Sequence, residues 1–235
     1  MIPTSQIERW LEEDLGHHDV TNHVPGDTEG RLVAKESGVV AGLDAAEAVF
    51  SYLDVDAEVL VEMGDRIEAG DTVFRVSGSA QAVLRGERVA VNIAGHASGV
   101  ATRTREAVDA AEDAARSAGV EPPRIAGTRK TTPGLRGIEK RAVAAGGGDT
   151  HRLDLSHMVM VKDNHVAEMG MDEAIAHFRE RTSFATKIEV EVERPEDAPR
   201  AAEAGADIVL LDKLSPAETA RGVALLDTET LAETS

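Results

Sequence analysis

The sequence contains no cysteine, which excludes disulfides, thiolate metal sites and a cysteine nucleophile. Aromatic residues make up only 3% of the 235 residues, and no basic stripe with aromatics between its charges is present, so nucleic-acid binding is not expected. No apolar run is long enough to cross a bilayer. The first ten residues lack the basic and then apolar order of a secretory signal. We therefore expect a cytoplasmic protein that binds neither nucleic acid nor a membrane.

Lysine is also scarce, because only six of the 25 basic residues are lysine. The formal net charge is −18. An acidic surface with few lysines and few aromatics favours a protein adapted to high salt, where dissolved ions screen the repulsion between like charges. An ordinary acidic enzyme is the alternative.

Apolar periodicity divides the chain near residue 100. The first part predicts a helix over 4–15, a strand pair in 30–42, a helix over 44–53, and strands over 55–61 and 72–76. A helix over 85–118, interrupted between Gly95 and Gly99, leads into the second part.

From residue 124 onward, apolar strands alternate with helices, which indicates a parallel sheet. The predicted strands are 124–126, 158–161, 187–192 and 207–211, and the predicted helices are 135–145, 171–181, 195–204 and 216–226. The polar tail 227–235 is expected to contain no strand. Because four strands are too few to close a barrel, we expect an open sheet or an incomplete barrel. The predicted domains are 1–100, rich in strands, and 101–235, of α/β type with its C-terminal strands missing.

Cations and imidazoles gather in three places between Gly127 and His165. Arg129 and Lys130 lie in a loop, His151 and Arg152 follow three glycines, and Lys162 ends an apolar strand. Ligands of parallel α/β domains bind outside the carboxyl ends of the strands. In so acidic a protein, this cluster predicts a pocket for a small polyanion. Solvated loop charges are the alternative.

The next two predicted strands carry carboxylates, the first within the strand and the second directly after it. Alternation places Glu189 and Glu191 on one face, with Glu191 nearer the carboxyl end, and Asp212 ends the following strand. Carboxylates at neighbouring strand ends can hold Mg²⁺ or accept hydrogen bonds from ribose hydroxyls. For His157 and His165 we expect structural roles or contacts that support ligand-binding residues, rather than metal ligation.

Several motifs occur in one order and together resemble the quinolinate phosphoribosyltransferase family over residues 7–226. They are Glu13-Asp-Leu-Gly-His-His-Asp-Val-Thr21, Gly86-Glu-Arg-Val-Ala-Val-Asn92, Thr128-Arg-Lys-Thr-Thr-Pro-Gly134, His151-Arg152, Lys162-Asp-Asn-His165, Lys187-Ile-Glu-Val-Glu-Val192 and Leu210-Leu-Asp212. The resemblance implies an open-faced β sandwich followed by an incomplete α/β barrel, in a homodimer or higher homo-oligomer with shared active sites. It also implies an enzyme of NAD biosynthesis that uses Mg²⁺ to transfer phosphoribose from phosphoribosyl pyrophosphate to quinolinate, with decarboxylation. The products would be nicotinate mononucleotide, pyrophosphate and CO₂.

The same resemblance implies residue roles. Quinolinate carboxylates would be held by Arg129, His151, Arg152 and Lys162, with Lys130 at the junction to the sugar phosphates and Arg88 supplied by the partner subunit. Lys130, Glu191 and Asp212 would be catalytic, with Glu191 and Asp212 facing the ribose and the metal. Members of the family continue with two more strands and glycine-rich loops that bind the ribose 5-phosphate, and we expect this chain to lack both. The alternative is a non-catalytic or molybdate-transport-associated relative that keeps an anion pocket.

Overall fold

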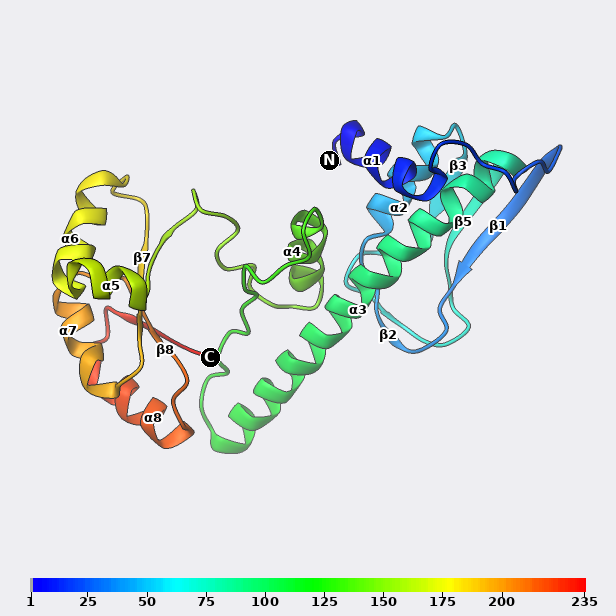
Figure 1. Cartoon of the computed structure of the whole chain (residues 1–235). Helices are drawn as coiled ribbons and strands as arrows, with labels where there is room; N and C mark the ends of the chain where they lie inside the picture. Colours follow the sequence, from blue (N-terminus) through cyan, green and yellow to red (C-terminus); the bar gives the residue numbers. More distant parts are fainter. Residues whose placement is uncertain (1) are drawn as a thin grey trace. The chain divides into compact units, whose positions relative to one another are not determined.

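A computed structural model describes residues 2–235 of the chain. Two compact units follow one another, the first ending at His151 and the second beginning at Arg152 (Figure 1). Among the described residues, none of the helices combines the length and apolar character that spanning a membrane requires.

The first unit combines helices with a small antiparallel sheet. Its helices are α1 (Thr4–Leu15), α2 (Leu43–Tyr52), α3 (Ala80–Ala118) and α4 (Arg136–Ala145). One sheet has the order β1 (Asp27–Val33), β5 (Thr72–Ser79), β3 (Asp56–Val59), and a separate pair joins β2 (Gly38–Val39) to β4 (Arg66–Ile67). The predicted helices over 4–15 and 44–53 are therefore confirmed. The strand pair expected within 30–42 is wrong, because β1 pairs with β5 and β2 with β4.

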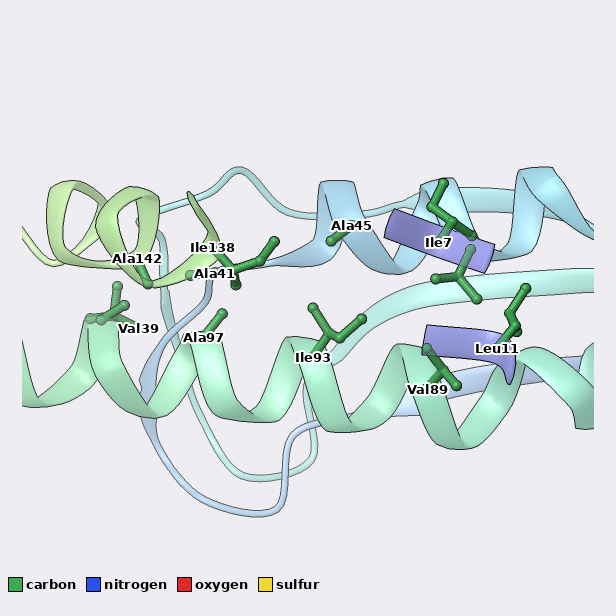
Figure 2. Packing of buried hydrophobic residues seen from close by; sticks show 12 residues of the cluster. Ile7, Leu11, Val39, Ala41, Ala45, Val89, Ile93, Ala97, Ile138 and Ala142 are labelled. Carbon is green, nitrogen blue, oxygen red and sulfur yellow. The ribbon is translucent and has the colours of Figure 1, made fainter. Parts of the chain in front are cut away.

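The four helices of this unit share one core, which is where the small residues of α3 are buried. Figure 2 shows Ile7 and Leu11 of α1 close to Val89 and Ile93 of α3. Farther along α3, it shows Ile138 and Ala142 of α4. A second cluster packs the sheet against α2 and α3, with the rings of Phe50 and Phe74 stacked at 5.8 Å between centroids. The sheet and the other helices are thus connected through α2 and α3, which contribute residues to both clusters.

The helix α3 is not interrupted at its glycines, contrary to the sequence-based prediction. It runs for 39 residues through both Gly95 and Gly99. Each glycine costs about 1 kcal/mol of helix propensity, but packing along α2 and α4 outweighs that cost. The predicted domain boundary at residue 100 falls inside this helix, whereas the compact units separate after His151.

The second unit is a parallel α/β layer. Its sheet has the order β6 (Val159–Val161), β7 (Ile188–Val192), β8 (Ile208–Leu211) and β9 (Leu231–Thr234). The helices are α5 (Asp163–Met169), α6 (Met171–Arg181), the 3₁₀ turn η1 (Pro195–Asp197) with α7 (Ala198–Glu203), and α8 (Pro216–Leu225). The parallel sheet predicted from residue 124 onward is confirmed for β6, β7 and β8.

Alternation along β7 decides which side chains face the helices. Val190 and Val192 belong to the buried cluster formed with α6 and α7, so Glu189 and Glu191 project from the opposite face. These two carboxylates therefore lie on the face of the sheet that α6 and α7 do not cover.

Two predicted features of the barrel part are wrong. The expected strand over 124–126 amounts to a single parallel bridge between Ala126 and Asp149. The tail expected to lack a strand contains β9, which pairs with β8 in parallel. The description of the C-terminal strands as missing is thus corrected for one strand.

Candidate functional site

In the first unit, the segment with Arg129 and Lys130 begins at the Ala126 bridge. The main-chain N–H of Gly127 donates to the Asp149 carbonyl, and that of Asp149 donates to the Ile125 carbonyl, each at 2.8 Å. This short ladder places the start of the Arg129–Lys130 loop beside the segment that leads to His151. Both basic side chains of the loop are exposed. The structure therefore holds the Arg129–Lys130 loop beside the segment that ends at His151, whereas Arg152 belongs to the second unit.

Two threonine hydroxyls accept hydrogen bonds within the Arg129–Lys130 loop and at its end. The hydroxyl of Thr128 accepts a hydrogen bond from the Lys130 N–H at 3.0 Å, and that of Thr131 accepts one from the Arg136 side chain at 3.3 Å. These bonds fold the backbone into the turn that carries Arg129.

The far end of the loop is held by the buried carboxylate of Glu139 in α4. This carboxylate accepts a hydrogen bond from the Thr132 main-chain N–H at 3.2 Å and another from the Nε2 of His96 at 2.9 Å. Burial alone would raise the pKa of Glu139, but the hydrogen bonds from Thr132 and His96 outweigh burial and hold that pKa below its usual range. Glu139 is thus an ionised anchor for the loop.

Arg88 is exposed on α3, within the first unit. One turn along the helix, Asn92 lines a cavity of about 640 Å³ that also contains Trp10 of α1 and Thr132 at the end of the loop. The helix and the loop thus border the same space. The supply of Arg88 to a partner's site stays a prediction.

In the second unit, three predicted residues form a group at the carboxyl ends of the strands. Lys162 follows β6, and its ammonium donates to the Glu191 carboxylate of β7 at 2.5 Å. Asp212 follows β8, with its main-chain N–H bound to the Val192 carbonyl at 3.0 Å. This confirms that parallel strand ends bring a cation and two carboxylates to one edge.

Asp212 is ionised in this arrangement. The Ser235 hydroxyl contributes most to lowering its pKa, followed by the Lys213 ammonium, with a smaller effect from the charge of Lys162. Glu191 and Asp212 each bind an ammonium group and keep little exposed surface, 11% and 16% of the side chain. Such carboxylates lie where a cation is stabilised, and the pair fits the oxygen ligands that Mg²⁺ requires.

Glu189 lies on the same face of β7 as Glu191 and is completely buried. Burial, and then the negative charge of Glu233 in β9, raises the pKa of Glu189 to about 8, although Arg152 and Lys162 act in the opposite direction. Arg152 itself is buried, at 9% exposure. A neutral carboxyl therefore accompanies Arg152 and Lys162 near neutral pH.

His157 and His165 have local structural roles, as expected. The Nδ1 of His157 accepts the Leu153 N–H at 3.2 Å, and the Nδ1 of His165 accepts the Lys162 N–H at 3.0 Å. The second bond closes the first turn of α5 and fixes the backbone of Lys162.

Sequence reasoning missed the polar residues of α4 that hold the loop. Ile138 and Ala142 are the apolar residues on the buried side of this helix, and Glu139 is buried with them. A glutamate among the apolar positions of this helix is the sequence feature that could have indicated a buried, hydrogen-bonded role for Glu139. The convergence of the cationic residues of the first unit with Arg152, Lys162 and the carboxylates of the second stays a prediction.

Comparison with known proteins gives a family for both parts of the chain. The family model of the quinolinate phosphoribosyl transferase N-terminal domain matches residues 19–98, and the family model of the C-terminal domain matches residues 100–234. Two curated relatives are a probable nicotinate-nucleotide pyrophosphorylase (carboxylating) of Methanothermobacter thermautotrophicus and the human nicotinate-nucleotide pyrophosphorylase (carboxylating). The first is 44% identical over 220 residues, 92% of this chain and 77% of the relative. The second is 41% identical over 215 residues, 90% of this chain and 71% of the relative.

Solved structures agree with these matches. NadC from Streptococcus pyogenes is 37% identical with a TM-score of 0.86, over 98% of this chain and 82% of that one. The nicotinate-nucleotide pyrophosphorylase from Francisella tularensis is 27% identical with a TM-score of 0.90, over 100% of this chain and 84% of that one. The predicted fold class, an open-faced β sandwich followed by an incomplete α/β barrel, is thereby confirmed.

Proposed function

Because the chain belongs to the quinolinate phosphoribosyltransferase family, we propose that it transfers phosphoribose from phosphoribosyl pyrophosphate to quinolinate in NAD biosynthesis. The chain is then a pentosyltransferase. The quinolinate nitrogen forms a bond to C1 of the ribose while the bond from C1 to pyrophosphate breaks. The C2 carboxylate then leaves as CO₂, and the electron pair left on C2 takes up a proton. The family matches favour this enzyme over a non-catalytic or molybdate-transport-associated relative.

Quinolinate binding is assigned to the basic residues of both units. Two adjacent ring carboxylates need several fixed cations, and Arg129, His151, Arg152 and Lys162 supply them. Support comes from the ladder at Ala126, which holds the Arg129 loop beside the approach to His151, and from the burial of Arg152. Lys130 is assigned to the junction between quinolinate and the sugar phosphates.

Glu191 and Asp212 are assigned to the ribose and to Mg²⁺. A bound Mg²⁺ would neutralise charge on the departing pyrophosphate. The two carboxylates themselves favour the positive charge that develops on the ribose as pyrophosphate leaves, because they lie at one edge of the sheet with little access to water. Lys162, now paired with Glu191, can exchange this partner for a substrate carboxylate.

The remaining predictions concern assembly and conditions. We assign a homodimer, or a higher homo-oligomer, in which Arg88 of one subunit completes the site of the other; its exposed position on α3 supports this role. The charge of −18 supports adaptation to high salt. A cytoplasmic setting stays a prediction.

The test is formation of nicotinate mononucleotide from quinolinate, phosphoribosyl pyrophosphate and Mg²⁺, at low and at multi-molar KCl. We expect turnover, with more activity at high KCl. Replacing Arg129 by alanine should weaken quinolinate binding at least about tenfold, since a charge-assisted hydrogen bond is worth about 1.5–3 kcal/mol. Arg31→Ala, at an exposed position of β1, is the matched control and should bind quinolinate normally. Unchanged affinity in Arg129→Ala would remove Arg129 from the site, and absence of product under all conditions would overturn the proposed reaction.

A further inference from the structure

The ladder that starts the Arg129–Lys130 loop stops one hydrogen bond early. After the bonds Asp149 N–H to Ile125 and Gly127 N–H to Asp149, a regular parallel ladder would continue from the His151 N–H to the Gly127 carbonyl. The His151 N–H instead donates to the carboxylate of Asp149 at 2.7 Å. His151 accordingly has a left-handed backbone, with φ of 50°.

A side chain takes the place of the missing bond. The ammonium of Lys140, in α4, donates to the Gly127 carbonyl at 3.2 Å and also to the Thr150 carbonyl. One of these carbonyls belongs to the segment that leads to Arg129, and the other belongs to the residue immediately before His151. A single charged group therefore bridges the two segments where their main-chain pairing ends.

The Lys140 side chain that forms this bridge is buried. Lys140 is only 4% exposed, so its charge depends on the acceptors around it. Burial, and then the charge of Arg136, lowers the pKa of Lys140, whereas the charge of Asp149 acts in the opposite direction. Three rotatable N–H donors suit an ammonium to two carbonyls from different segments.

We infer that Lys140 is a positioning residue that sets the spacing between the Arg129–Lys130 loop and His151, and so tunes the site for a ligand with two adjacent carboxylates. Lys140 itself is enclosed by protein and binds main-chain oxygens, so its effect passes through the backbone. A monocarboxylate can be held by one segment alone, whereas a dicarboxylate that binds both segments depends on their separation. This inference rests on the proposed assignment of Arg129 and His151 to quinolinate.

The test compares two ligands in Lys140→Met, which keeps the apolar stem and removes the donors. We expect the Kd for quinolinate, measured by calorimetry, to rise at least about tenfold, since a buried charge-assisted bond is lost. The inhibition constant for nicotinate, which has one carboxylate, should change much less. The matched control is Lys35→Met, the same substitution at an exposed lysine, which should leave both constants unchanged. Lys140→Arg, which keeps the charge and the donors, should recover part of the loss.

The outcomes separate the possible failures. An equal loss for quinolinate and nicotinate, or a normal quinolinate Kd in a folded Lys140→Met, would overturn the role in spacing. If Lys140→Met does not fold, Lys140→Gln carries the same comparison, because its amide still donates to one carbonyl. A wild-type protein that binds no quinolinate would instead contradict the ligand assignment on which the inference rests.

Discussion

Replacing the buried Glu189 by glutamine should remove a pH dependence from the stability of the protein. Glu189 is completely buried on β7, and its pKa is raised from 4.5 to about 8 by burial and then by the charge of Glu233. Glutamine has nearly the same shape and does not titrate. The comparison therefore isolates the ionisation of one side chain.

The sign follows from which state binds the proton. Between pH 4.5 and 8, the folded state keeps Glu189 protonated while the unfolded state releases the proton. The stabilising contribution of this protonation is therefore complete below the unfolded pKa and is lost as pH rises through the folded pKa. From pH 5 to pH 9, the loss amounts to about 4 kcal/mol, at about 1.4 kcal/mol for each unit of pKa difference.

The assay is urea unfolding of wild type and Glu189→Gln at several pH values from 5 to 9. The free-energy difference between the two proteins should shift by about 4 kcal/mol in favour of glutamine across this range. Glu203→Gln, at an exposed position of α7, is the control and should show no such shift. A difference between wild type and Glu189→Gln that stays constant with pH would refute the reasoning, since Glu189 would then titrate alike in both states.

Two further predictions concern packing and the metal. Gly146→Ala should destabilise the protein by about 1–3 kcal/mol, because the added Cβ would lie 2.4 Å from the Ala101 carbonyl oxygen. Thermal unfolding measures this, and Gly137→Ala, whose Cβ would meet only the Arg141 side chain at 3.8 Å, should be neutral or stabilising; equal effects would contradict the packing argument. Asp212→Asn should raise the Mg²⁺ concentration that supports half-maximal product formation by about tenfold, because one charged ligand is lost. An unchanged Mg²⁺ dependence would remove Asp212 from the metal site.

The strands and helices with strong apolar periodicity could be predicted from the sequence. The alternation in β7 was enough to place Glu189 and Glu191 on one face, and the ends of β6, β7 and β8 located Lys162 and Asp212. Periodicity works here because burial of one face decides the fold of each element.

Other features depend on contacts that local sequence does not express. β9 is a polar segment held by main-chain hydrogen bonds, such as that from the Leu231 N–H to the Asp207 carbonyl. Main-chain hydrogen bonds of this kind can form whatever the side chains are, so the sequence of β9 contains no apolar pattern that would predict a strand. The glycines of α3 look like a break for the converse reason, because the packing that keeps this helix continuous comes from elements distant in sequence.

The same limit explains why the supports of the site were harder to foresee than its ligand-binding candidates. Lys162 and Asp212 stand out because each follows an apolar strand, and Arg129 stands out because it lies in a loop bounded by Gly127 and Gly134. Lys140 and Glu189 act by burial, and burial depends on the whole fold. Near neutral pH the buried Glu189 is neutral, so it adds no negative charge to that of the Glu191 and Glu233 carboxylates near Arg152 and Lys162. The neutral carboxyl group thereby limits the negative charge around Arg152 and Lys162, the two cations of this unit that we assign to quinolinate.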